Sequence, residues 1–285
     1  MKHFFRDLAR SKAGLFGAVL LLVIIATALL APVLDLPDPT RGDLRARLAG
    51  PTWDGLFSPG AHPLGTDEVG RDILSRLVHG SRMTLMVAST AVILGGIVGT
   101  VLGIFAGYKG GIIDRLLMRL VDIQLAIPLM LLALLVVAAL GPSIRNVVLV
   151  LALTSWIRYA RIIRAQVLSL REREFVQSAR AIGASTGRIM FLHILPNVMT
   201  PALVVGTLEL ARVIIMDAAL SFLGLGVQPP TPSWGRMLAD GRVYLSSAWW
   251  AVTFPGLAIV LTVLSVNLFG DWLRDYFDPK TRSAK

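Results

Sequence analysis

Long runs of apolar residues without a single charge constrain this chain more than any other feature. Residues 13–34, 83–108, 123–144 and 243–270 each contain no Asp, Glu, Lys or Arg. A helix needs about 20 mostly apolar residues to cross the hydrocarbon core of a bilayer, and each run meets that length. The chain is 55% hydrophobic with a mean hydropathy of +0.69, which is unusual for a soluble domain. We therefore predict a membrane protein in which these four runs are spanning helices.

Two further spans are predicted from less regular stretches. Residues 146–157 are too short alone, but they reach the membrane surface if Arg158, Arg161 and Arg164 extend their side chains to the interface. Residues 201–226 form the remaining span, the fifth in chain order, although three charged residues interrupt it. The predicted fold is thus all-α, a polytopic membrane protein with six transmembrane helices.

The distribution of Lys and Arg predicts the orientation. With the N-terminus inside, the inner connections hold most of the 28 Lys and Arg residues, as the positive-inside rule requires. Both termini are therefore predicted to be cytoplasmic. Residues 13–34 are longer than the apolar part of a signal peptide and precede Pro-Val-Leu-Asp, so we expect this span to be retained.

The spans divide the chain into four parts. These are residues 1–58 (an N-terminal cytoplasmic segment, the first span and the start of an outer loop), 59–82 (an outer amphipathic segment), 83–272 (a core of helices two to six that includes a cytoplasmic loop at 164–196) and 273–285 (a cytoplasmic tail). In the outer segment Asp67, Glu68 and Asp72 do not have the spacing of a calcium loop. We expect them to cap and pack a short amphipathic helix around residues 73–77.

Several classes of function are excluded by what the sequence lacks. Its net charge of +10 is scattered between apolar spans, which argues against nucleic-acid binding. There is no cysteine, the four histidines are far apart, and no Gly-x-x-x-x-Gly-Lys-Ser/Thr phosphate loop occurs. We predict no catalytic residue, no metal site and no directly bound cofactor, so the chain is not an enzyme on its own.

A soluble-looking stretch interrupts the core between the fourth and fifth spans. It reads EFVQSARAIGASTGRIMFLHILPN, residues 174–197. Phe175, Ala179 and Ile182 recur at helical spacing on one face, and Gly183 permits the tight backbone that ends a helix. Ser185 or Thr186 can cap a second helix over residues 187–195, with a break at Pro196. A surface loop with an amphipathic helix and a helix that docks into a soluble partner both remain possible readings.

This stretch resembles the cytoplasmic EAA loop of ABC-importer membrane subunits. Gln177-Ser178-Ala179 stands where the loop has Glu-Ala-Ala, and Gly183 and then His193-Ile194-Leu195-Pro196 follow in register. Gln177, Ser178 and His193 depart from the pattern. The resemblance implies a coupling segment, residues 172–196, that contacts a partner ATPase. The implied coupling residues are Phe175, Gln177, Ser178, Ala179, Arg180, Ile182, Gly183, Leu195 and Pro196.

Three other stretches narrow the resemblance. Residues 62–85, 107–128 and 219–238 are similar to the dipeptide/oligopeptide/nickel branch of these permeases, and more specifically to its second, C-type subunit. This implies a type I ABC-importer permease in the bacterial inner membrane that imports peptides, with nickel chelates or glutathione as alternatives. The implied partners are a sister permease, two cytoplasmic ATPases that hold ATP and Mg, and an extracytoplasmic substrate-binding protein.

Three charged residues inside the fifth predicted span, residues 201–226, allow two interpretations. Glu209, Arg212 and Asp217 lie at membrane depth, where charges usually pair internally or line a water-filled path. Either Glu209 and Arg212 form an internal salt bridge or this helix lines the translocation path. A secondary carrier that relays ions through these residues is the alternative from a different class, although such carriers usually show inverted repeats. A membrane scaffold that recruits a regulator is a further alternative.

Glycines four residues apart mark a packing face in the second predicted span. Gly95, Gly99 and Gly103 share one side of the helix, where the absence of side chains permits close backbone approach. We expect this face to pack within the subunit, with contact to a sister permease as the alternative.

Overall fold

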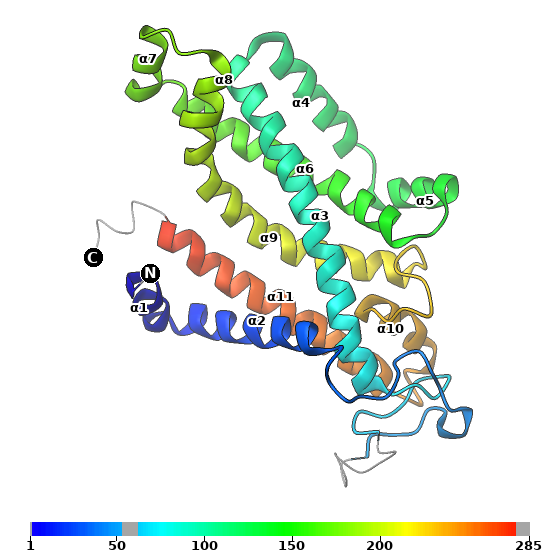
Figure 1. The fold of residues 1–285 in the computed structure, drawn as a ribbon. Coiled ribbons are helices and arrows are strands. Elements are labelled where there is room, and N and C mark those ends of the chain that lie inside the picture. Colours follow the sequence, from blue (N-terminus) through cyan, green and yellow to red (C-terminus); the bar gives the residue numbers. More distant parts are fainter. Residues whose placement is uncertain (1, 53–61, 278–285) are drawn as a thin grey trace.

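The computed structural model describes residues 2–52 and 62–277, and these residues are mostly helical (Figure 1). The helices are α1 (Lys2–Arg10), α2 (Lys12–Leu30), α3 (Ile73–Lys109), α4 (Gly111–Leu125), α5 (Leu129–Leu140), α6 (Ile144–Leu170), α7 (Glu174–Ala181), α8 (Thr186–Arg188), α9 (Leu195–Phe222), α10 (Trp234–Gly241) and α11 (Trp250–Phe277). Within the described ranges the β-pairing amounts to one isolated bridge between Thr66 and Asp72. The all-α prediction is confirmed. The predicted tail beyond residue 277 and the first residues of the outer segment lie outside the described ranges.

Four described helices, α2, α3, α6 and α11, are long and apolar enough to cross a membrane, and the bent pair α4 and α5 would make a fifth. The predicted third span, residues 123–144, is not one helix. α4 ends at Leu125, Pro128 caps α5, and the two helices are bent by 88°. Proline disfavours helical backbone in the residue before it, and here the chain turns more sharply than the kink expected in a continuous span. α9 has 28 residues but carries three charged side chains and is not among the candidates.

The first turns of α3 correct another expectation. The stretch around residues 73–77 is not a separate short helix, because α3 runs without interruption from Ile73 to Lys109. The Asp72 carboxylate accepts a hydrogen bond from the Ser75 N–H at 2.7 Å, which confirms the predicted capping role. Gly80, inside this helix, lies against Trp234 of α10. Residue 82 is therefore no structural boundary.

The chain also remains helical where a break was predicted at Pro196. A π-helical turn, Ile189–Ile194, joins α8 to α9, and the Leu195 N–H donates to the Met190 carbonyl. Proline has no N–H to satisfy, and it is tolerated in the first turn of a helix. Because the wider turn ends directly before Pro196, the ring enters α9 without interrupting it.

The predicted glycine face lies against α6. A Cβ added at Gly95 would meet Ser155 and Ala152, one at Gly99 would meet Trp156 and Tyr159, and one at Gly103 would meet Ala160 and Ile163, each with a nearest atom within 3 Å. Any larger residue on this face would therefore push α3 and α6 apart. α3 and α6 form the most extensive helix pair of the described chain and hold the core together.

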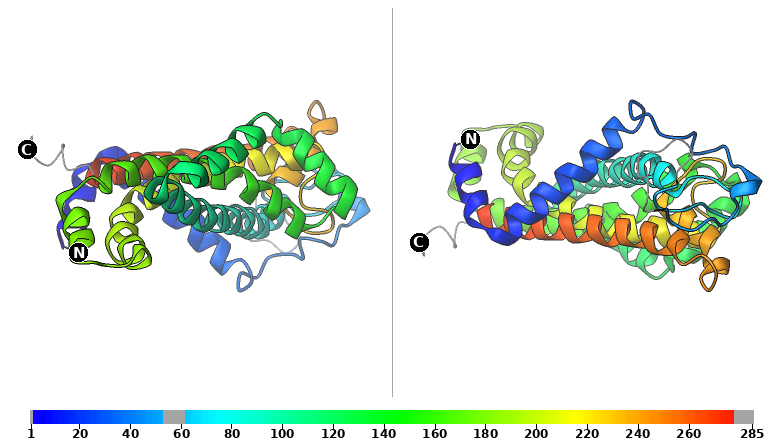
Figure 2. Two further views of the ribbon diagram at one scale, coloured as in Figure 1. Left: turned by 90° about the horizontal axis from the view of Figure 1, so that it is seen from above. Right: turned by 90° about the horizontal axis from the view of Figure 1, so that it is seen from below.

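The remaining helices complete an elongated body. α2 lies along α11, and α9 packs against α3, α6, α10 and α11 (Figure 1). Figure 2 shows α1, α7 and the C-terminal end of α11 at one end of the molecule, and the loop after α2 at the opposite end. The sites described below occupy these two ends and the middle of the helices between them.

Candidate functional site

The predicted coupling segment forms a short exposed helix at one end of the molecule. α7 buries Val176 and Ala179 against the body of the protein, while Phe175 is 42% and Ile182 is 85% exposed. The prediction that Phe175, Ala179 and Ile182 form one apolar face is therefore wrong. Ala179 is buried, whereas Phe175 and Ile182 are exposed. Val176, which anchors α7, was not among the predicted residues. An apolar pair on an exposed helix is a surface suited to contact with another protein.

Gly183 ends α7 as predicted. Its φ is +79°, in the left-handed region that side chains disfavour. Gly183 N–H donates to the Arg180 carbonyl and Ala184 N–H donates to the Ala179 carbonyl, each at 3.0 Å, the two bonds of a Schellman turn. The Ser185 hydroxyl then accepts from the Arg188 N–H at 3.4 Å and starts α8.

Polar contacts fix this segment to the nearby end of α3. Arg180 Nε donates to the Tyr108 hydroxyl at 3.1 Å, and its guanidinium lies 4.9 Å from the centre of that ring. Arg171 donates to the Gly107 carbonyl at 3.1 Å. The position of α7 therefore depends on the end of a long membrane helix, which is the connection that a coupling device needs.

The other residues of the predicted coupling set take different positions. Gln177 and Ser178 are exposed, and Gln177 donates to the Glu172 carbonyl at 3.2 Å. Pro196 is exposed and Leu195 partly buried, both at the start of α9. The segment is thus a hairpin of α7 and α8, and four exposed residues of the predicted set, Phe175, Gln177, Ser178 and Arg180, belong to α7.

A second candidate site lies in the middle of the helices, where Arg158, Glu209 and Arg212 form an arginine–glutamate cluster. The Glu209 carboxylate is buried and accepts from Arg212 Nε at 3.0 Å and Arg212 Nη2 at 2.8 Å. Arg158 Nε of α6 lies 3.1 Å from the same carboxylate. The sequence spacing predicted the pair within α9 but not Arg158, which comes from another helix and was expected to reach the interface.

Arg161 and Arg164 follow Arg158 along α6 and also pair with acids. Arg161 lies 2.7 Å from Asp122, and Arg164 binds Asp114, so both join α6 to α4. Each of these arginines has a carboxylate of its own, whereas Arg158 and Arg212 share one. The three arginines were expected to extend to the membrane interface. In the structure they form ion pairs between helices instead.

Asp217, the third charge of the predicted path, stands apart from this cluster. Its side chain is fully buried, and neither carboxylate oxygen has a hydrogen-bond partner among the described residues. The Ser221 hydroxyl, one turn further along α9, is buried and unpartnered as well. The structure therefore brings together only Glu209 and Arg212 of the three predicted residues.

An apolar groove of about 610 Å³ adjoins the arginine–glutamate cluster. Its walls come from α3 and α9, and Tyr159, next to Arg158 in α6, also lines it. Gly206 and Leu210 of α9 lie within one turn of Glu209 and line it too. The groove and the cluster therefore draw on neighbouring residues of α6 and α9.

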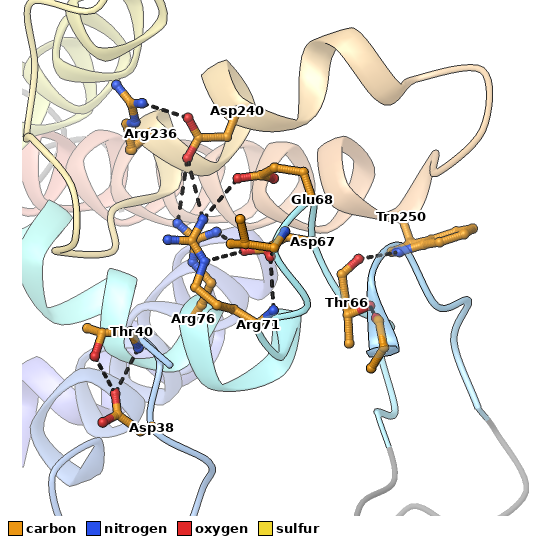
Figure 3. A network of polar contacts seen from close by, with 12 residues as sticks. Asp38, Thr40, Thr66, Asp67, Glu68, Arg71, Arg76, Arg236, Asp240 and Trp250 are labelled. Carbon is orange, nitrogen blue, oxygen red and sulfur yellow. Dashed lines mark hydrogen bonds and ion pairs between the residues drawn. The ribbon is translucent and has the colours of Figure 1, made fainter. Parts of the chain in front are cut away.

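The opposite end of the molecule holds a buried outer charge network (Figure 3). Its members are Asp67, Glu68, Arg71, Arg76, Arg236 and Asp240. Figure 3 shows the guanidinium groups of Arg71 and Arg76 gathered between Asp67, Glu68 and Asp240. Arg71 donates to Asp67 at 2.7 Å and to Glu68 at 3.0 Å, and Arg236 lies 2.9 Å from Asp240. The network ties the start of α3 to α10, so the outer loop is a fixed surface.

Burial has a measurable electrostatic effect in this loop. It raises the pKa of Glu68, and the neighbouring Asp67 carboxylate raises it further. Asp38, fully exposed in the same loop, instead has its pKa lowered by the hydrogen bonds it accepts from Thr40. Within the described residues no group of three or more His, Asp or Glu side chains could hold a metal ion.

Comparison with known proteins identifies relatives over the whole chain. Residues 99–283 match the family described as the binding-protein-dependent transport system inner membrane component. Residues 1–51 match the N-terminal transmembrane domain of oligopeptide transport permease C. The two matches together cover both the first helix and the core.

Individual relatives are similar from end to end. The di/tripeptide transport system permease protein DppC of Pseudomonas aeruginosa is 45% identical over 285 residues, 100% of this chain and 93% of the relative. The dipeptide transport system permease protein DppC of Escherichia coli K12 is 46% identical over 99% of this chain and 94% of its own length. The protein of the same name from Alkalihalophilus pseudofirmus is 44% identical over 98% of this chain and 90% of its own length.

Proposed function

This chain belongs to the family of inner membrane components of binding-protein-dependent transport systems, and we propose that it carries dipeptides and related short peptides inward as one transmembrane subunit of an ATP-driven importer. It is a multi-pass protein of the bacterial inner membrane and a non-catalytic permease subunit. The observation that carries the proposed substrate is the 45% identity, over the whole chain, to a di/tripeptide permease. That likeness favours peptides over nickel chelates or glutathione.

The proposed topology has six spans with both termini in the cytoplasm. α2, α3, α6, α9 and α11 each supply one span, and α4 with α5 supplies a bent one. The common location of α1, α7 and the C-terminal end of α11 at one end of the molecule supports this orientation. The concentration of Lys and Arg in the connections at that end supports it as well.

The proposed partners are those of the family's transport systems: a sister permease, two cytoplasmic ATPases that bind ATP and Mg, and an extracytoplasmic binding protein. The exposed pair Phe175 and Ile182 supports contact between α7 and an ATPase. The outer charge network supports docking of a binding protein, because it gives the outer loop a fixed shape. This chain itself holds no nucleotide in the proposed system and takes no nucleic acid as a partner.

Uptake in the native cell tests this proposal. A strain without this subunit should lose uptake of a radiolabelled dipeptide such as alanyl-alanine, while uptake of free alanine is unchanged. A plasmid copy of the subunit should restore dipeptide uptake. Unchanged dipeptide uptake in the deletion strain, with loss of nickel or glutathione uptake instead, would reject the peptide assignment and keep the importer.

A further inference from the structure

The arginine–glutamate cluster carries one positive charge in excess. Arginine stays protonated in proteins, so Arg158 and Arg212 contribute two positive charges against the single carboxylate of Glu209. Arg212 donates through Nε to Oε1 of Glu209 at 3.2 Å and through Nη2 to Oε2 at 2.8 Å, which is the bidentate geometry that binds most firmly. Glu209 is therefore already satisfied before Arg158 approaches.

Arg158 is the member of the cluster that remains open to a ligand. Its side chain is 57% exposed, against 20% for Arg212, and the ion pair of its Nε with Glu209 is its one polar side-chain contact among the described residues. The donors on its two terminal nitrogens are thus available. Guanidinium groups bind carboxylates through such paired donors.

The position of Arg158 along α6 limits what can face it. Arg158 lies near the middle of α6, and Glu209 lies near the middle of α9. Arg158 directly follows the apolar stretch 146–157, so it adjoins the membrane-spanning part of α6. A half-exposed guanidinium facing hydrocarbon is costly, so this surface faces protein or a water-filled path.

We propose that Arg158 binds the C-terminal carboxylate of the peptide during its passage through the membrane. The inference rests on the proposed function. It goes beyond that function by naming a residue that contacts the substrate. The apolar groove lined by Tyr159, Gly206 and Leu210 begins within one helical turn of the cluster, and it would take the apolar side chain next to that carboxylate. Glu209 cancels part of the positive charge, which keeps the contact weak enough for release.

The test compares a free dipeptide with its amide in the complete transporter. Alanyl-phenylalanine and alanyl-phenylalanine amide are offered to vesicles that contain this subunit with its sister permease, ATPases and binding protein. Both probes are used at concentrations that saturate the binding protein, whose affinities are measured separately. Arg158→Gln should lower uptake of the free acid about tenfold, the effect of losing a hydrogen bond to a charged group, while amide uptake is unchanged.

Two further variants complete the design. Arg158→Lys keeps the positive charge and should preserve most of the preference for the free acid. Arg161→Gln removes another half-exposed arginine of α6, one that has its own acid in Asp122, and should leave the ratio of acid to amide uptake as in the wild type.

Three results would overturn the inference. Equal losses of acid and amide uptake in Arg158→Gln would show that Arg158 does not distinguish the carboxylate. Failure of Arg158→Gln to assemble with the sister permease, with normal assembly of Arg158→Lys, would assign Arg158 to an acidic side chain of that partner. Absence of dipeptide uptake by the wild-type complex would instead reject the proposed function, and the inference with it.

Discussion

The guanidinium of Arg180 lies 4.9 Å from the centre of the Tyr108 ring, and its Nε donates to the hydroxyl of that ring at 3.1 Å. This double contact joins α7 to the end of α3, although the two residues are far apart in the chain. α3 in turn packs along α6 through its glycine face. The contact between Arg180 and Tyr108 is therefore one route by which a push on α7 by an ATPase would reach the α3–α6 pair.

Tyr108→Ala should weaken this transmission. A cation–π contact at an exposed site contributes about 0.5–1 kcal/mol, so α7 should be held less firmly but not lost. We expect severalfold fewer peptides imported per ATP hydrolysed, with normal amounts of assembled transporter. Uptake and ATP hydrolysis are measured in the same vesicles. Tyr108→Phe keeps the ring but loses the hydroxyl, so its number of peptides imported per ATP should lie between those of the wild type and Tyr108→Ala. A wild-type number of peptides per ATP in Tyr108→Ala would contradict this route of transmission.

Gly183 and Gly187 provide a matched pair of substitutions in the coupling segment. A Cβ at either position would meet nothing within 4 Å, but only Gly183 has a positive φ, +79°. Gly183→Ala should therefore strain the backbone by about 1 kcal/mol, whereas Gly187→Ala should not. Gly183→Pro cannot adopt this conformation and also removes the hydrogen bond to Arg180.

The expected result is a graded loss of transport with unchanged membrane insertion. Gly183→Pro should abolish peptide uptake, Gly183→Ala should reduce it, and Gly187→Ala should leave it unchanged. Uptake is compared at equal amounts of membrane-inserted subunit, determined by immunoblotting. Normal uptake by Gly183→Pro would remove the segment from the coupling mechanism.

Features that depend on residues close together in the sequence are predicted better than contacts between residues far apart in it. The helices α2 and α11 follow from charge-free runs, because a bilayer accepts little else. The end of α7 follows from Gly183, a local backbone requirement. Pro128 and Pro196 show the limit of this reasoning, since the chain bends at the first and stays helical at the second. The difference lies in the π-helical turn before Pro196, which residue spacing does not reveal.

Contacts between helices were predicted least well. Spacing within α9 pairs Glu209 with Arg212, but nothing local indicates that Arg158 shares the same carboxylate. The outer charge network was missed for the same reason, because Asp240 meets Arg71 and Arg76 only after α10 has packed. A count of the charges in each predicted helix that lack a local partner would have indicated that partners exist elsewhere. It would not have identified those partners.

Asp67→Asn should destabilise the outer loop far more than Asp38→Asn. Asp67 accepts from Arg71 and from Arg76, whose side chain is 2% exposed, and removing one member of a buried ion pair costs about 3 kcal/mol. Asp38 is an exposed acid of the same loop that lies 3.5 Å from the exposed Arg41. The unfolding midpoint of the solubilised complex should fall by several degrees for Asp67→Asn and stay unchanged for Asp38→Asn. Equal midpoints would show that the network does not stabilise the loop.

Glu68 gives the same network a defined pH dependence. Because burial raises its pKa above the ordinary value of 4.5, ionisation is harder in the folded protein than in the unfolded chain. The contribution of Glu68 to stability therefore falls as the pH rises from about 4.5 through the raised pKa. Glu68→Gln removes this loss. The unfolding midpoint of the variant should gain on that of the wild type as the pH is raised from 4.5 to 7, and a gain by the wild type would contradict the direction of the shift.

The pairing of Glu209 with Arg212 is tested by a double-mutant cycle in the solubilised complex. Glu209→Gln leaves the positive charges of Arg158 and Arg212 without their acid at membrane depth, so it should be the more damaging single substitution. Adding Arg212→Gln removes one of those charges and should restore part of the lost stability. The interaction free energy should be about 1–3 kcal/mol, well above the roughly 0.5 kcal/mol within which independent sites add. Additive effects on the unfolding midpoint would mean that the pair does not stabilise the fold, even though the two side chains are in contact.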